Sequence, residues 1–136
     1  MVGAPKKLTA GASFLPNGTE AAGTMLLDYG DQQTTISYSK VTSSVHPSIV
    51  QGELGTLAFD TLNQPSYVRM LCRDGRTEEL FTPVKNNMVH ELNAFARMIA
   101  RGESTAAFDG QSLTVMRLLD EARRQVGIDF GDGEKL

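Results

Sequence analysis

The sequence predicts an α+β fold: an open, mostly antiparallel sheet of about six to seven strands with two C-terminal helices on one face. The first two-thirds of the 136 residues read as short strands separated by turn residues, and the last third changes to helical spacing. Strands followed by helices are typical of α+β folds. The length fits a single domain over residues 1–136, with a loose polar tail at 129–136.

Three strands are expected in the first part of the chain, at residues 7–14, 23–29 and 33–41. Asn17 and Gly18 tolerate positive φ angles and indicate the first turn. Gly30 and Asp31 indicate the second turn. The third strand is rich in threonine, isoleucine and tyrosine, which suit a pleated surface.

Four shorter strands are expected at residues 48–51, 56–60, 67–72 and 78–81. The run 52–55 begins and ends with glycine and reverses the chain between the first two of these strands. The run 73–76, Arg-Asp-Gly-Arg, is a hairpin signal between the last two.

The first helix is expected from an apolar stripe at spacings of four, three and four: Met88, Leu92, Phe95 and Ile99. Asn86 or Asn87 can cap its start, and Gly102 suits its end. The second helix is expected at residues 111–126, ending at Gly127, with Asp120 and Arg124 as an ion pair four residues apart. Its apolar stripe comprises Val115, Leu118, Leu119, Ala122 and Val126.

Composition and charge exclude several classes of protein. A net charge of −3 and no basic stripe argue against nucleic-acid binding. No apolar run is long enough for a membrane span, and residues 1–7 lack the apolar core of a signal peptide. The single cysteine, Cys72, suits a reducing compartment, so a cytoplasmic location is expected.

No catalytic, cofactor-binding or metal-binding residue is assigned from the sequence. His46 lies in a loop before a proline and His90 in a helical first turn, and we interpret both as structural or surface residues. Neither has a second histidine or a glutamate at metal-ligand spacing. Cys72 alternates with Val68 and Met70, which indicates a small buried apolar residue rather than a reactive thiol.

The remaining polar residues also fit structural roles. A hydrolase nucleophile is usually a serine flanked by glycines. That context is missing at four serines considered as candidates: Ser37, Ser39, Ser43 and Ser44. Glu78 and Glu79 point to opposite sides of a strand and are interpreted as solvated. Asp28 and Asp31 flank a turn, where aspartate hydrogen-bonds locally. No glycine-rich nucleotide loop is present.

Several strands carry apolar residues on both faces, as Met25 and Leu27 oppose Leu26, and Met70 opposes Leu71. Two helices cover only one face of a broad sheet. The other face is therefore expected to bury against a second subunit or another domain.

The order and spacing of several segments resemble the C-terminal domain of the glucose-fructose oxidoreductase/inositol dehydrogenase (Gfo/Idh/MocA) family. The segments are Leu15-Pro16-Asn17-Gly18, residues 23–30, Tyr38-Ser39-Lys40, residues 51–57, the 67–80 hairpin and the 116–123 helix. The resemblance runs from about Gly3 to Phe130. It implies an N-terminal Rossmann domain in the longer protein, NAD or NADP as cofactor, and hydride transfer with a sugar, inositol or related polyol.

The resemblance also implies a homodimer through the open sheet face. The family's glycine-rich loop, its Glu-Lys-Pro motif and its Asp-x-Gly-x-His helix are absent from this chain. Neither His46 nor His90 takes the family histidine's place, so no catalytic role is transferred. The chain is therefore expected to be a substrate-side and dimerisation domain that is inactive and binds no cofactor alone.

Two alternatives stay open. The first is a stand-alone, non-catalytic sheet module that binds a partner or a small ligand. The second is an enzyme complete in this chain, with polar third-strand residues facing substrate: Gln33, Thr35, Ser37, Tyr38, Ser39 and Lys40. A solvated or interface strand face is the preferred interpretation of those residues.

Overall fold

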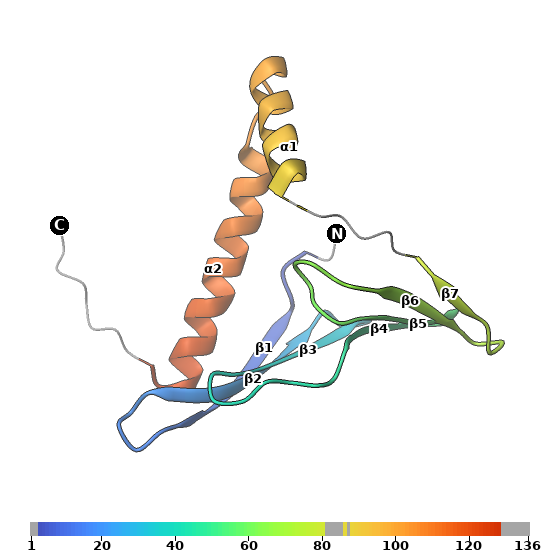
Figure 1. The fold of residues 1–136 in the computed structure, drawn as a ribbon. Helices are drawn as coiled ribbons and strands as arrows, with labels where there is room; N and C mark the ends of the chain where they lie inside the picture. Colours follow the sequence, from blue (N-terminus) through green and yellow to red (C-terminus); the bar gives the residue numbers. More distant parts are fainter. Residues whose placement is uncertain (1–2, 81–85, 87, 129–136) are drawn as a thin grey trace. The chain divides into compact units, whose positions relative to one another are not determined.

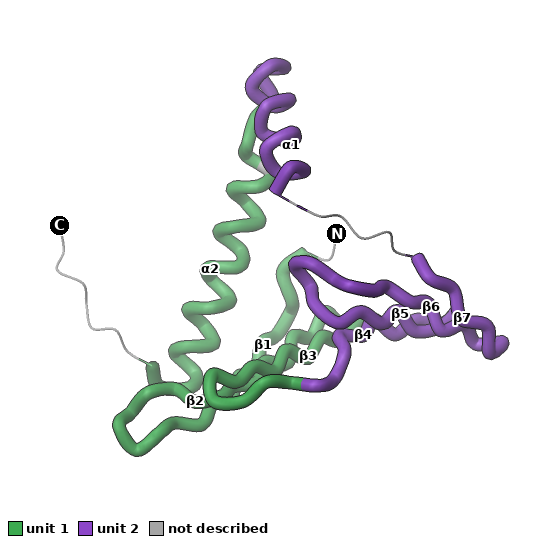
Figure 2. The backbone as a smooth tube through the Cα atoms, viewed as in Figure 1, with its two compact units in different colours: residues 1–44, 104–136 green, residues 45–103 purple. Residues whose placement is uncertain are grey.

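The computed structural model describes residues 3–80, 86 and 88–128. The chain divides into two compact units, which Figure 2 shows in different colours. The first unit comprises Met1–Ser44 and Ser104–Leu136, and the second comprises Val45–Glu103. The first unit therefore joins two stretches that are distant in the sequence, and the second is continuous.

The first unit contains a three-stranded antiparallel sheet with the strand order β1-β2-β3. Its strands are β1 (Lys7–Phe14), β2 (Glu20–Asp28) and β3 (Gln33–Ser39). In the register, Leu8 faces Leu27 and Ala10 faces Met25, so the apolar side chains of β1 and β2 share one face. Leu26 lies on the opposite face.

Helix α2 (Ala106–Val126) packs on β1, as Figure 1 shows. Leu8, Leu27 and Ala122 form the centre of this contact and are each less than a tenth exposed. Met25 and Leu118 pack around them. This small core fixes the helix over one edge of the sheet.

Gln125 of α2 is hydrogen-bonded to the backbone of edge strand β1. Its Oε1 accepts from the Ala10 N–H at 2.8 Å, and its Nε2 donates to the Leu8 carbonyl at 3.0 Å. Glu121 Oε1 accepts from the same Nε2 at 2.7 Å. The amide thus takes the place of a neighbouring strand and satisfies polar groups that a sheet edge leaves open.

The second unit contains a four-stranded antiparallel sheet with the order β4-β5-β6-β7. Its elements are β4 (Ser48–Gly52), β5 (Gly55–Phe59), β6 (Val68–Cys72), β7 (Thr77–Glu79) and helix α1 (Met88–Arg101). The register places Val50, Leu57 and Met70 in one row. On the other face Arg69 pairs with Glu79 at 2.6 Å.

The predicted α+β class and antiparallel pairing are confirmed. The strands pair in two sheets rather than in one continuous sheet. Between β3 and β4 the chain runs through hydroxyl-rich bends and Pro47, which lacks an N–H for a ladder. Helix α2 covers a face of the first sheet, and α1 has no buried residue.

Most boundaries agree with the sequence-based expectations. β2 begins at Glu20 rather than Gly23, and β3 ends at Ser39 rather than Val41. Helix α2 begins at Ala106 rather than Gln111. The expected end of the last strand at Phe81, the alternative cap Asn87 and the tail 129–136 lie outside the described residues.

The helix ends confirm the capping predictions and correct one ion pair. Asn86 Oδ1 accepts from the Met88 N–H at 3.1 Å, and Gly102 and Gly127 both have positive φ angles. The predicted Asp120–Arg124 pair was wrong: the pairs are three residues apart, Asp120 with Arg123 at 3.2 Å and Glu121 with Arg124 at 2.7 Å. In the described part of the chain, neither helix has the length and apolar character of a membrane span.

Candidate functional site

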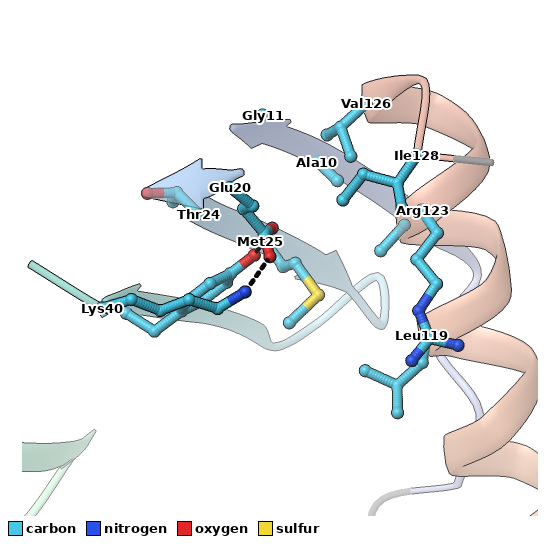
Figure 3. A pocket seen from close by; sticks show the side chains of 12 residues that line it. Ala10, Gly11, Glu20, Thr24, Met25, Lys40, Leu119, Arg123, Val126 and Ile128 are labelled. Atoms are coloured by element: carbon cyan, nitrogen blue, oxygen red, sulfur yellow. Dashed lines mark hydrogen bonds and ion pairs between the residues drawn. The ribbon is translucent and has the colours of Figure 1, made fainter. Parts of the chain in front are cut away.

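A cavity of about 330 Å³ lies in the first unit between α2 and the sheet. Its apolar lining includes Ala10 and Met25 from the sheet and Leu119, Val126 and Ile128 from α2 and the residues after it. Figure 3 shows these side chains around the open space. A small concave site with mostly apolar walls and a few polar groups is the usual form of a ligand pocket.

The polar wall of the cavity is formed by Glu20, Tyr38 and Lys40, which we call the Glu20 cluster. Lys40 Nζ donates to Glu20 Oε2 at 2.8 Å, and the Tyr38 hydroxyl donates to Glu20 Oε1. The Lys40 N–H donates to the Ala21 carbonyl at 2.8 Å and so holds Lys40 beside β2. Arg123 of α2 completes the charged lining (Figure 3).

The antiparallel register of β2 and β3 assembles the cluster. Gly23 of β2 lies directly opposite Tyr38 of β3. A Cβ atom on Gly23 would lie only 2.5 Å from the Tyr38 Oη, so the glycine leaves room for the ring. With that room, the phenol extends across β2 and reaches Glu20.

The charges of the cluster are set by its own hydrogen bonds. Hydrogen bonds from Lys40 and then Tyr38 hold the pKa of Glu20 below its ordinary 4.5. The same bond to Glu20 raises the pKa of Tyr38 above its ordinary 10.0. Near neutral pH the carboxylate is therefore ionised and the phenol protonated. The arrangement can bind hydroxyls or charged groups, but neither Glu20 nor Tyr38 is poised to exchange a proton at neutral pH.

The cavity includes two of the residues weighed in the sequence, Tyr38 and Lys40. The other polar third-strand residues, Gln33, Thr35, Ser37 and Ser39, alternate to the opposite face and are exposed. There Ser37 Oγ lies 3.2 Å from Thr24 Oγ1, and Ser39 Oγ accepts from the N–H groups of residues 41 and 42.

The remaining candidates lie away from this lining. His46 and His90 are exposed residues of the second unit and do not line the cavity. Cys72 is half-buried rather than buried, and desolvation followed by the charge of Glu78 raises the pKa of its thiol. A raised pKa disfavours the reactive thiolate.

The two glutamates of β7 have separate partners. Glu79 pairs with Arg69, and Glu78 lies on the other face, where it pairs with Arg76 at 2.9 Å. Ser43 and Ser44 lie in the bends after β3. The Asp28 carboxylate accepts from the Gly30 N–H at 2.8 Å, which confirms its role in the turn.

Glu20 is the site residue that the sequence reasoning missed, because the strand was expected to begin at Gly23. The signal that could have indicated this site was a glycine directly opposite an aromatic residue on the neighbouring strand. Recognising that signal requires the pairing register of the two strands, which the sequence alone does not give. Among the described residues no group of three histidine, cysteine, aspartate or glutamate side chains could hold a metal ion.

The described residues do not fit a dinucleotide. Its pyrophosphate is usually held by a glycine-rich turn between a strand and a helix N-terminus. Helix α2 starts instead after Ser104 and Thr105, which follow α1 and not a strand.

Comparison with known proteins identifies two relatives. The chain is 35% identical over 133 residues to scyllo-inositol 2-dehydrogenase (NADP(+)) IolU of Bacillus subtilis, covering 96% of this chain and 40% of that protein. It is 36% identical over 142 residues to the uncharacterised oxidoreductase YgjR of Escherichia coli, covering 100% of this chain and 42% of that protein. No protein-family model matches.

The chain thus spans about two-fifths of the length of these curated relatives. Similarity extends through nearly all of this chain, so it includes both sheets and both helices. The fold agrees with the predicted α+β class: open antiparallel sheets followed by helices. These two similarities are consistent with the predicted resemblance to a C-terminal fragment of a Gfo/Idh/MocA oxidoreductase.

Proposed function

We propose that this chain is the substrate-side and dimerisation domain of a cytoplasmic NAD(P)-dependent oxidoreductase that acts on a sugar, inositol or related polyol. One observation carries the proposal: the full-length similarity of the chain to part of an NADP-dependent scyllo-inositol dehydrogenase. In this proposal the cofactor and the acid–base residues belong to a Rossmann domain outside the chain. The chain alone binds no nicotinamide cofactor and has no turnover.

The binding chemistry of the first unit supports a substrate-side role. The Glu20 cluster presents an ionised carboxylate, a protonated phenol and an ammonium group, which are hydrogen-bonding partners suited to hydroxylated molecules. The pKa of Glu20 is lowered and that of Tyr38 is raised, so these two groups can orient a substrate but do not replace an acid–base residue.

A domain exchange tests this proposal. The chain replaces the homologous part of the Bacillus subtilis dehydrogenase, and NADP-dependent oxidation of a panel of inositols and sugars is measured. A dimeric chimera that oxidises at least one polyol is expected. The control is the same dehydrogenase without the exchanged part, which is expected to be inactive. A folded chimera that binds NADPH but oxidises no member of the panel would contradict the substrate-side role.

We further propose that the face of the first sheet opposite α2 pairs two copies of the chain. Leu26, which is 39% exposed, lies at its middle between Thr9 and Thr35 of the flanking strands. Within the first unit, α2 packs on the other side of the sheet. A sheet face with a central apolar residue and short hydroxyl side chains suits a two-fold contact.

Sedimentation equilibrium tests the dimer. The unmodified chain is expected to sediment as a dimer at micromolar concentration, and Leu26→Arg is expected to sediment as a monomer because it buries a charge in the contact. Gln32→Arg adds the same charge in an exposed turn and is the matched control. A monomeric unmodified chain, or a dimer that tolerates Leu26→Arg, would refute this surface.

A further inference from the structure

Each charged side chain that lines the cavity of the first unit has a partner of opposite charge. Lys40 pairs with Glu20 at 2.8 Å, and Arg123 pairs with Asp120 at 3.2 Å. The Glu20 side chain is only 15% exposed, so solvent would screen little of its repulsion toward a second anion. The cavity therefore favours a ligand without net charge.

The Glu20 cluster has hydrogen-bonding capacity left for such a ligand. Glu20 accepts from Tyr38 at one carboxylate oxygen and from Lys40 at the other, and each oxygen has a further acceptor site. The Lys40 ammonium group has further donors, and the Tyr38 phenol oxygen can still accept. Hydroxyl groups, which both donate and accept, can therefore bond to all three side chains.

The cavity also has an aliphatic end, formed by Ala10, Val126 and Ile128. Figure 3 shows these three side chains beside one another, on the side of the opening away from Lys40. The guanidinium group of Arg123 extends in the other direction, toward Leu119 (Figure 3). A hydroxyl group against the aliphatic end would lose its hydration without gaining a partner, whereas a methyl group there would bury apolar surface.

A fully hydroxylated ring matches only one end of this cavity at a time. In scyllo-inositol every hydroxyl group is equatorial, so the ring is polar all round its edge and both of its faces present only C–H groups. An edge bonded to Glu20 leaves hydroxyls of the opposite edge against the aliphatic end. A face laid on the aliphatic end turns the other face, which lacks hydroxyls, toward the cluster. A molecule with hydroxyls at one end and a deoxygenated carbon at the other matches both ends.

We propose that this cavity binds an uncharged polyol with one deoxygenated end, such as a 6-deoxyhexose. Its hydroxyls bond to the Glu20 cluster, and its methyl group lies against Ala10, Val126 and Ile128. The inference rests on the proposed function and narrows its substrate class. The hydroxyls gain charge-assisted hydrogen bonds to Glu20 and Lys40, and the methyl group removes the aliphatic end from water.

Amide-resolved NMR titration of this chain tests the site. The probe is L-fucose, and the matched ligand is L-galactose, which differs from it only by a hydroxyl group on C6. Saturable shifts at the cavity-lining residues are expected with L-fucose. About tenfold weaker binding is expected with L-galactose, because its additional hydroxyl is desolvated without a partner. Equal affinity for the two sugars, tighter binding of scyllo-inositol, or no saturable shifts with L-fucose would overturn the proposal.

Variants locate the methyl group. Val126→Thr keeps the shape of the side chain but places a hydroxyl at the aliphatic end, and it is expected to reduce the preference for L-fucose to about twofold. Val115→Thr is the matched control, because Val115 lies on the same helix, is 54% exposed and does not line the cavity. Glu20→Gln is expected to weaken the binding of both sugars alike, by about tenfold. An unchanged preference in Val126→Thr would refute the placement of the methyl group.

The domain exchange separates this inference from the proposed function. A chimera that oxidises polyols but treats L-fucose and L-galactose alike would overturn the preference and leave the substrate-side role standing. A chimera that oxidises no polyol would contradict the substrate-side role. The titration of the isolated chain needs no turnover, so it decides the preference in either case.

Discussion

The phenol ring of Tyr38 lies across Gly23, its directly paired residue on the neighbouring strand. The ring needs the absent side chain of the glycine in order to reach Glu20. This relationship links a backbone position on β2 to the polar wall of the cavity. A substitution at Gly23, which carries no side chain, can therefore test the geometry of the Glu20 cluster.

Gly23→Ala is expected to displace the Tyr38 ring and break its hydrogen bond to Glu20. The loss should lower the free energy of unfolding by about 1 kcal/mol, measured in urea. The pKa of Tyr38 should fall back toward 10.0, which tyrosinate absorbance reports when Tyr38→Phe is used to assign the signal.

Gly11→Ala is the control for this substitution. A Cβ at Gly11 of β1 would meet no atom within 4 Å. We expect Gly11→Ala to leave the free energy of unfolding unchanged or to raise it by about 0.5 kcal/mol. Equal destabilisation by the two substitutions would contradict the packing of Tyr38 on Gly23.

Gly55→Ala should be strongly destabilising. Gly55 has a φ angle of 157°, and an added Cβ would collide with the main-chain carbonyl oxygen of Leu71, which cannot rotate away. A loss of about 2 kcal/mol or more is expected in urea unfolding. Gly52→Ala, in the same hairpin, has its nearest contact at 3.9 Å and should change stability by only about 0.5 kcal/mol. Similar losses at the two glycines would argue against the described β5–β6 register.

The free energy of unfolding should depend on pH through the carboxyl group of Asp60. Hydrogen bonds from Ser66 and Thr61 lower its pKa from 3.8 to about 2. A carboxyl group with a lowered folded-state pKa stabilises the fold above its unfolded pKa, and that contribution disappears as pH falls toward about 2.

The stability difference between the unmodified chain and Asp60→Asn should therefore be constant at neutral pH and shrink between pH 3.8 and about 2. Urea unfolding over this pH series measures it. Ser66→Ala removes the largest cause of the lowered pKa and should reduce the dependence. A difference that does not vary with pH would show that the Asp60 carboxylate is not held in this way.

Gln125→Ala should loosen α2 from β1, because it removes both hydrogen bonds to the Leu8 and Ala10 backbone. We expect the free energy of unfolding to fall by about 1–2 kcal/mol and the amide hydrogen of Ala10 to exchange faster. Arg124→Ala, one residue earlier on the exposed side, should cost less than about 0.5 kcal/mol. Unchanged exchange at Ala10 in Gln125→Ala would exclude the amide as an edge cap.

Local patterns predicted most elements but not their assembly. Alternation gave β1 at Lys7–Phe14, and the spacing from Met88 to Ile99 gave α1. Helix α2 was expected to begin at Gln111, but it begins at Ala106 and continues through Gly110, a residue of low helical propensity. The division into two sheets depends on which strands pair with each other. Periodicity along one strand does not identify its partner strand, so this division could not be predicted from it.

The Glu20 cluster could not be predicted for a related reason. Its members are 18 and 20 residues apart in the sequence and meet only through the β2–β3 register. Lys40 and Tyr38 were visible as polar residues of a strand, but neither position nor type indicated that Glu20 lies between them. The ion pairs of α2 show a similar limit, because Asp120 lies at helical spacing from both Arg123 and Arg124, and Arg124 lies at helical spacing from both Asp120 and Glu121.

The most direct test of the substrate-side role is the steady-state kinetics of the domain exchange with the Bacillus subtilis dehydrogenase. The Kd for NADPH should stay within about twofold of the parent enzyme, because the cofactor site is contributed by the retained part. The KM and preference among polyols should change, because in the proposed function the exchanged domain lines the substrate. A chimera with the parent's polyol preference and an altered NADPH affinity would contradict the account.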